Sequence, residues 1–144
     1  PKLGWRLYSK DAKEFDQPVN WTKLRVDYVI PEYGSELTNE SYILEMGFER
    51  LHGVDFKKGC YIGQEVTARM KHKTELRKGL VKISSEQDIS NGEELLLNDK
   101  PIGSVLTTYG TSALAYVRLK NRDAILSTKN SKKIVVDKDP ILSN

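Results

Sequence analysis

Cysteine is almost missing from this chain of 144 residues, which contains only Cys60. One cysteine cannot form a disulfide within the chain, and one thiol with two histidines is too small a set for a zinc or iron–sulfur site. We therefore expect no stably bound metal on this chain alone. The scarcity of cysteine is typical of a reducing compartment, so we expect a cytoplasmic or mitochondrial-matrix location.

Long apolar runs and a large charge excess are also missing. No run approaches the roughly 20 residues that a membrane-spanning helix needs, so we expect no membrane partner. The 23 basic and 20 acidic residues give a net charge of +3, which is too small to indicate a polyanion partner by itself. The chain begins without a methionine and in mid-pattern, and we expect it to be a piece of a longer protein.

Residue spacing in the first half predicts a strand, two helices and an irregular segment. Residues 3–8 alternate as a short strand does, and residues 21–30 have helical periodicity that Pro31 ends. Residues 41–51 are apolar without a clear period, and we expect them to pack against the turn that holds Cys60. Residues 64–72 place apolar and basic side chains on opposite sides of a second helix.

Short β-type runs dominate the second half. Their spacing of roughly ten residues, with turn residues between them, indicates a small antiparallel barrel or sandwich. We therefore expect a boundary between residues 1–72 and residues 73–144. The expected strands are 80–83, 94–97, 102–108, 113–119, 124–128 and 134–136.

Cys60 lies in the sequence KKGCYIGQE, between two lysines and the second helix. Lys57, Lys58 and the positive end of the helix dipole favour the thiolate form of the cysteine. Gly59 and Gly63 allow the backbone to turn tightly and to approach a ligand. The alternative is a buried structural cysteine, because free cysteine is among the most buried residue types.

A basic stretch over residues 69–78 follows the turn and is opposed only by Glu75. Such a stretch is either a solvated helix face or a surface for RNA or a phosphorylated ligand. No aromatic residue is interleaved with the basic ones, so we do not expect nucleic acid as a partner.

The run from Lys58 to Glu65, followed by Arg69, resembles the signature of the YgfZ-type folate-binding proteins of iron–sulfur cluster assembly, which include a mitochondrial branch. Residues 24–27 with 31–37, and residues 102–105 and 114–118, are similar to further parts of that family, and Glu45 fits its next acidic position. The family is related to the T-protein of glycine cleavage, an aminomethyltransferase. The resemblance implies an α+β fold, with a partial aminomethyltransferase-like folate-binding domain over residues 1–72 and a small antiparallel, Greek-key type β-barrel over residues 73–144. The family's N-terminal half has no counterpart in this chain.

The implied function is that of a tetrahydrofolate-binding accessory factor, which assembles or repairs iron–sulfur clusters in client enzymes through Cys60. Cys60 would be a functional thiol and a shared cluster ligand, with an iron–sulfur carrier or client protein as its partner. We expect a non-enzymatic assembly factor, because the T-protein's catalytic aspartate would lie in the absent half. The alternatives are a folate-dependent aminomethyltransferase or other one-carbon transferase, and an RNA-binding module that uses residues 69–78.

The resemblance also implies which side chains contact tetrahydrofolate. Asp27 matches a carboxylate that binds the pterin ring in the T-protein, although it could equally be a solvated helix residue or pair with Lys23. The expected folate contacts are Arg25, Asp27, Lys58, Tyr61, Gln64, Glu65 and Arg69.

Overall fold

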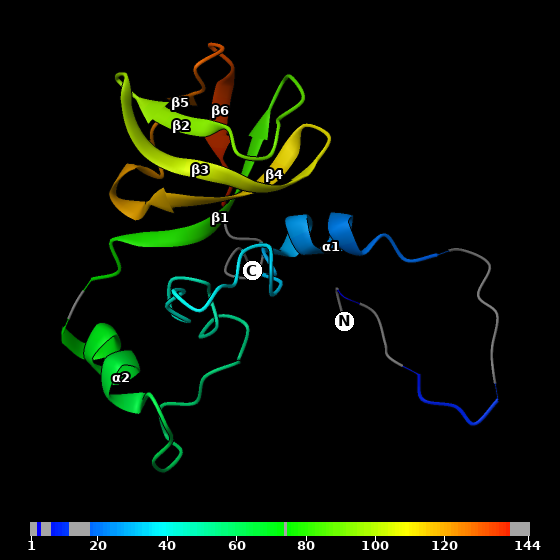
Figure 1. Cartoon of the computed structure of the whole chain (residues 1–144), viewed down its shortest axis with the longest axis vertical. Coiled ribbons are helices and arrows are strands. Elements are labelled where there is room, and N and C mark those ends of the chain that lie inside the picture. Colours follow the sequence, from blue (N-terminus) through cyan, green and yellow to red (C-terminus); the bar gives the residue numbers. More distant parts are fainter. Residues whose placement is uncertain (1–2, 4–6, 12–17, 74, 139–144) are drawn as a thin grey trace.

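The computed structural model describes residues 3, 7–11, 18–73 and 75–138. Within these ranges, a barrel of six strands forms one end, α1 lies directly below it, and α2 stands apart at the other end (Figure 1). The strand expected over residues 3–8 falls mainly outside the described residues. No helix in the described ranges is both long enough and apolar enough to cross a membrane.

The six strands pair antiparallel and close into a barrel in the order β1-β4-β3-β2-β5-β6, with β6 next to β1. Successive strands β2, β3 and β4 are neighbours while β1 lies beside β4, which is a Greek-key order. The expected barrel and all six of its strands are confirmed. Their bounds are β1 (Lys78–Ser85), β2 (Glu94–Leu97), β3 (Lys100–Tyr109), β4 (Ser112–Arg118), β5 (Leu126–Ser127) and β6 (Lys133–Val136).

The barrel interior is filled by aliphatic side chains from every strand. Ile83, Leu95 and Ile134 have no exposed surface, and burial of such a side chain stabilises the fold by roughly 1.5–3 kcal/mol. Gly103 marks the closest approach of β3 to β4, because a Cβ there would lie 2.4 Å from the carbonyl oxygen of Tyr116. No side chain larger than hydrogen fits at that point.

Helix α1 (Trp21–Tyr28) is confirmed and ends two residues before the expected bound. Asn20 caps its start, with the side-chain oxygen accepting from the backbone N–H of Lys23 at 2.8 Å. Val29 adopts a left-handed conformation with φ 53°, which turns the chain away before Pro31. Val26 and Val29 are buried against Leu114 of β4, so α1 is fastened to the barrel.

The apolar segment over residues 41–51 forms a series of turns, as expected for an irregular segment. Leu44 and Met46 are buried, and the backbone N–H of Leu80 donates to the carbonyl of Glu45 at 2.8 Å. This bond ties the segment to the start of β1. Cys60 itself is exposed, so the expected packing of this segment does not cover the thiol.

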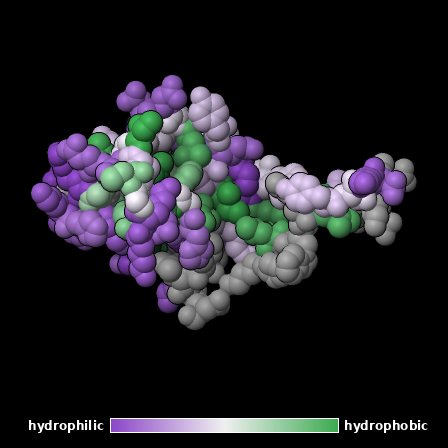
Figure 2. All heavy atoms as spheres, turned by 90° about the horizontal axis from the view of Figure 1, so that it is seen from below, coloured by the Kyte–Doolittle hydropathy of each residue, from purple (hydrophilic) through white to green (hydrophobic). Residues whose placement is uncertain are grey.

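Helix α2 (Gln64–Lys73) is also confirmed, but it carries little buried surface, and Thr67 is its one buried residue. An ion pair between Lys71 and Glu49 and an edge-on contact of 6.1 Å between the rings of His72 and Phe56 connect it to the preceding segments. On the face seen in Figure 2, hydrophilic side chains gather on the side that carries α2. The boundary expected at residue 72 falls within the last turn of α2, and the division into two domains stays a prediction.

Candidate functional site

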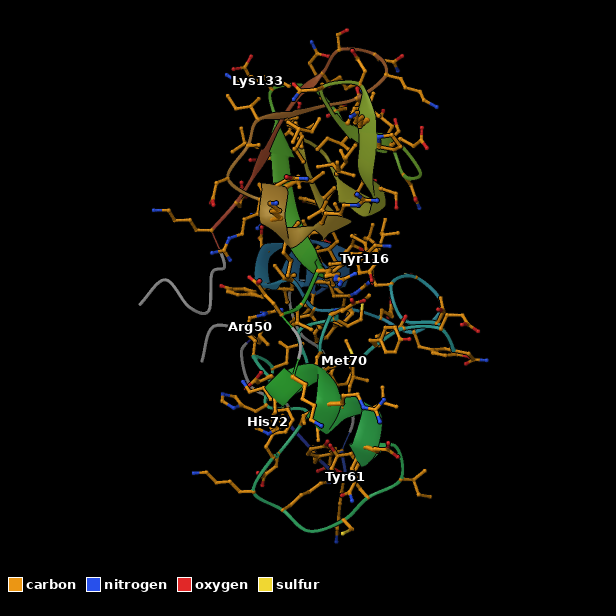
Figure 3. The ribbon with its side chains drawn as sticks, turned by 90° about the vertical axis from the view of Figure 1, so that its left-hand side faces the viewer. Arg50, Tyr61, Met70, His72, Tyr116 and Lys133 are labelled. Carbon is orange, nitrogen blue, oxygen red and sulfur yellow. The ribbon has the colours of Figure 1, made fainter. Side chains whose placement is uncertain are left out.

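The turn that holds Cys60 lies at the end of the molecule opposite the far strands of the barrel. In Figure 3, Tyr61 marks this end and Lys133 marks the other. Cys60 is exposed, so the alternative of a buried structural cysteine is wrong. The thiol can be reached by a partner from solvent.

Local contacts hold the turn in shape. The side-chain oxygen of Gln64 accepts from the backbone N–H of Tyr61 at 3.2 Å, and the ammonium of Lys58 lies 4.9 Å from the centre of the Tyr61 ring. Gly63 has φ +85°, a left-handed conformation that glycine adopts without strain. Gly59 has no such φ and no close neighbour, so the tight turn expected at both glycines is confirmed at Gly63 only, and approach of Gly59 to a ligand stays a prediction.

Two more of the expected folate residues pair along α2. Glu65 and Arg69 form an ion pair of 2.6 Å one helical turn apart, with side chains that are 81% and 65% exposed. Pairs this exposed contribute little to stability. Arg69 also lines a pocket on the barrel side of the helix, and it is the one residue of the expected set that does so.

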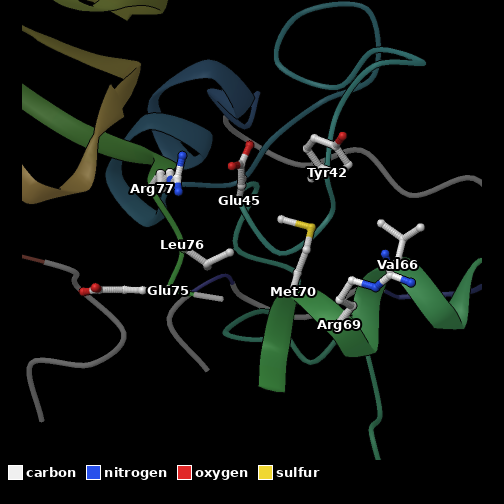
Figure 4. A pocket seen from close by; sticks show the side chains of 8 residues that line it. All are labelled: Tyr42, Glu45, Val66, Arg69, Met70, Glu75, Leu76 and Arg77. Atoms are coloured by element: carbon white, nitrogen blue, oxygen red, sulfur yellow. The ribbon is translucent and has the colours of Figure 1, made fainter. Parts of the chain in front are cut away.

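This pocket of about 240 Å³ lies between α2, the turn segment and the chain that leads into β1 (Figure 4). Met70 and Leu76 point into it, and Glu45 and Arg77 add one charge of each sign. Its full lining is Tyr42, Glu45, Val66, Arg69, Met70, Glu75, Leu76 and Arg77.

Glu45 and Tyr116 join this pocket to the barrel. The Tyr116 hydroxyl on β4 donates to a carboxylate oxygen of Glu45, and the Lys78 ammonium lies 5.5 Å from the centre of the same ring. Burial of Tyr116, together with the bond to Glu45, raises the pKa of its hydroxyl well above the ordinary value. Tyr116 therefore stays protonated as a donor, which leaves Glu45 as an acceptor at the pocket.

Arg25, another expected folate contact, lies instead in a buried network beside the barrel. Its guanidinium pairs with Glu32 at 2.6 Å and with Glu36, whose side chain is fully buried. Glu36 also accepts from the backbone N–H of Glu32 at 2.9 Å and from the Thr107 hydroxyl on β3. This arrangement connects α1, the following turn and the barrel, and it is a structural use of Arg25.

Asp27 has two lysine partners. It pairs with Lys23 one turn earlier, which was the structural alternative, and with Lys82 of β1 at 3.0 Å. Burial raises the pKa of Asp27, but the hydrogen bonds from the two lysines outweigh it, and the pKa lies below its ordinary value. The carboxylate is ionised and both of its oxygens already accept a hydrogen bond.

The expected site residues therefore lie in three places rather than one. Lys58, Tyr61 and Gln64 shape the Cys60 turn, Glu65 and Arg69 lie on α2, and Arg25 and Asp27 lie between α1 and the barrel.

Sequence reasoning missed the pairing of Glu45 with Tyr116, because 71 residues separate them and no local pattern links them. The one sequence feature that pointed to Glu45 was its match to an acidic position of the YgfZ-type proteins.

Metal-ligating side chains do not gather in the part of the chain that the structure describes. No group of three or more histidine, cysteine, aspartate or glutamate residues there has the geometry to hold a metal ion. Cys60 offers one sulfur ligand, so any cluster that it contacts needs its other ligands from elsewhere.

Comparison with known proteins gives matches over both halves of the chain. Residues 77–141, which contain all six strands, match the family model described as CAF17, C-terminal beta-barrel domain. The chain is 54% identical over 93 residues to the mitochondrial iron-sulfur cluster assembly factor IBA57 homolog of Mycosarcoma maydis. The aligned stretch covers 58% of this chain and 23% of that protein.

Two further relatives come from an animal and a bacterium. The mouse mitochondrial iron-sulfur cluster assembly factor IBA57 is 34% identical over 93 residues, which cover 59% of this chain and 26% of that protein. The tRNA-modifying protein YgfZ of Aliivibrio fischeri is 29% identical over 98 residues, which cover 67% of this chain and 30% of that protein. The chain thus spans less than a third of the length of each relative. Residues 77–141 thus match a CAF17 C-terminal beta-barrel domain, and the chain is homologous to IBA57 and YgfZ proteins over part of their length.

Proposed function

We propose that this protein takes part in the assembly or repair of iron–sulfur clusters in client enzymes, and that Cys60 contacts the cluster. The observation that carries the proposal is the exposed thiol at the tip of a turn that projects away from the barrel. The names of the IBA57 relatives support the process, since they are iron-sulfur cluster assembly factors. We place this activity in a bacterial cytoplasm or a mitochondrial matrix.

The chemistry proposed for Cys60 is ligation of a cluster in transit. The thiol gives its proton to solvent, and the sulfur donates an electron pair to an iron atom of the cluster. One thiolate of the carrier leaves that iron with its own electron pair and takes up a proton, so the exchange involves no change of oxidation state. Lys57 and Lys58, three and two residues before Cys60, bring positive charge to this stretch of the chain. A cluster typically has four thiolate ligands, so the carrier or client protein supplies those that this chain lacks.

The pocket beside α2 is our candidate for the pterin ring of tetrahydrofolate. Its volume of about 240 Å³ is below the roughly 300 Å³ at which pockets for whole small ligands begin, so it fits one ring system. Glu45 offers a carboxylate acceptor to the amino edge of the ring, and Arg69 lies at the rim. Arg25 and Asp27 already have protein partners, which argues against a direct role in binding.

The thiol is tested by mixing the protein, at its natural full length, with a cluster-loaded carrier and recording visible cluster absorbance. We expect Cys60→Ser to lose most of the signal that develops on this protein, because serine is a poor ligand for iron. The matched control is Ile62→Ala, which changes an exposed side chain on the same turn and keeps the thiol. Equal signals for Cys60→Ser and the unaltered protein would overturn the proposal.

The folate site is tested separately by titration calorimetry with tetrahydrofolate. We expect Glu45→Gln to weaken binding by about tenfold, which corresponds to one charge-assisted hydrogen bond. Unchanged affinity for Glu45→Gln, together with a large loss for Asp27→Asn, would move the site to α1. Release of formaldehyde from methylene-tetrahydrofolate by the same protein would favour a one-carbon transferase instead.

A further inference from the structure

A second hollow lies on the barrel side of the last turn of α2, where the chain enters β1 and leaves β4. It is an open cleft of about 1200 Å³. The backbone N–H of Leu119 donates to the carbonyl of Arg77 at 3.0 Å, and Lys78 pairs with Arg118 in the sheet. These contacts bring Lys73 and residues 75–78 close to residues 118–122, and the two segments form the walls of the cleft.

Positive charge dominates this cleft. Glu75 is its one acidic lining residue among the described parts of the chain. The six basic side chains that line it are Lys73, Arg77, Lys78, Arg118, Lys120 and Arg122. A concave surface with one sign of charge concentrates its electric field and attracts a ligand of the opposite sign.

Most of these cations have no carboxylate partner in the part of the chain that the structure describes. Lys73, Arg77, Arg118 and Lys120 form no ion pair in the described ranges, and Lys78 lies over the Tyr116 ring. Arg122 lies 4.0 Å from a carboxylate oxygen of Asp123, in a pair that is 65% and 95% exposed. The charges of the cleft are therefore available to an anionic partner.

Two apolar side chains also line the cleft, among its cations. Leu76 and Leu119 are both half-buried and line opposite walls. No aromatic side chain is among its lining residues in the described ranges, so a single nucleic-acid strand would find no ring on which to stack its bases. A phosphate backbone also has nothing apolar to place against the two leucines.

We propose that this cleft docks an acidic segment of a partner protein. Glutamate or aspartate carboxylates lie against the six cations, with the arginines able to bind them through two hydrogen bonds each. An apolar side chain of the same segment packs on Leu76 and Leu119. Arginine around a small apolar centre is a common composition of protein interfaces.

The cleft is separate from Cys60 but within reach of the same partner. Helix α2 begins four residues after Cys60 and ends at Lys73 on the cleft, and its ten residues span roughly 15 Å. A protein that docks its acidic segment in the cleft would lie one helix length from the thiol. The docking itself does not depend on the role proposed for Cys60.

The test measures fluorescence anisotropy of a short labelled peptide of Glu-Glu-Leu repeats with the protein at its natural full length. We expect the double variant Arg118→Gln with Lys120→Gln to bind about tenfold more weakly, because two carboxylate contacts are lost. The matched control, Lys100→Gln with Lys133→Gln, removes two exposed charges from the barrel outside the cleft and should bind within about twofold of the unaltered protein.

Two further probes fix the class of partner. A peptide of Glu-Glu-Ser repeats has the same charge without the apolar anchor, and we expect it to bind more weakly than the leucine peptide. A labelled single-stranded RNA of equal length should bind more weakly as well. Tighter binding of RNA, equal losses in the cleft and control variants, or no binding of the leucine peptide would each overturn the proposal.

Discussion

In the barrel, Ile83, Leu95 and Ile134 are fully buried, whereas Ile62, beside Cys60, is fully exposed. The same contrast holds for the elements around them. Every strand contributes to the interior of the barrel, while the segment over residues 57–73, the Cys60 arm, has one buried residue in its helix. The barrel supplies the stability of the fold, and the arm supplies exposed chemistry.

Polar contacts differ between the two regions in the same way. Glu36, beside the barrel, is buried and accepts hydrogen bonds from three groups. Glu65 on the arm has a side chain that is 81% exposed, and it forms an exposed ion pair with Arg69. A buried charge depends on its partners for stability, and an exposed one has water instead. Substitutions with the same chemistry should therefore have very different consequences in the two regions.

The largest expected difference comes from removing an aliphatic side chain in each region. Leu95→Ala leaves a cavity in the closed barrel and should lower the free energy of unfolding by about 3 kcal/mol. Ile62→Ala should change it by less than about 0.5 kcal/mol, because its side chain is in water in the folded state as well. Urea unfolding measures both, and equal losses would contradict the assignment of stability to the barrel.

An intermediate effect should separate two arginines that were both expected to bind folate. Arg25→Ala leaves the buried Glu36 carboxylate without its cation and should cost about 3 kcal/mol of unfolding free energy. Arg69→Ala removes an exposed pair and should cost less than about 1 kcal/mol. A stability loss for Arg69→Ala as large as that for Arg25→Ala would show that the arm is held more firmly than its exposure indicates.

The smallest effect concerns acid stability in the barrel. A hydrogen bond from Lys132 lowers the pKa of Glu93 below its ordinary value, although burial opposes the shift. A carboxyl group whose pKa is lower in the folded than in the unfolded state stabilises the fold at any pH above its unfolded pKa. This contribution is lost as the pH falls through the pKa of the folded state.

Glu93→Gln should therefore reduce the melting temperature by a few degrees at pH 7 and by less at about pH 3. Scanning fluorimetry across this range measures the difference. An equal drop in melting temperature at both pH values would mean that ionisation of Glu93 does not stabilise the fold. The exposed Glu65→Gln variant on the arm is the matched control, and its melting temperature should change little at either pH.

The order and type of the elements could be predicted from local patterns. Helical periodicity before Pro31 indicated α1, and apolar runs separated by turn residues indicated all six strands. The bounds were less certain, since Val29 adopts a left-handed conformation that the sequence does not reveal. For the site, the KGCYIGQE motif singled out Cys60, but local patterns could not show that Arg25 and Asp27 lie away from it, between α1 and the barrel.

The sequence by itself determined the order of the six strands and the single thiol on a basic turn, because short apolar runs between turn residues and the scarcity of cysteine can be read along the chain. Only the tertiary structure decided which distant side chains meet. It paired Glu45 with Tyr116 and Asp27 with Lys82, and it placed Arg118 beside Arg77 and Lys78. Such contacts depend on strand order and register, which bring together residues that no local pattern connects.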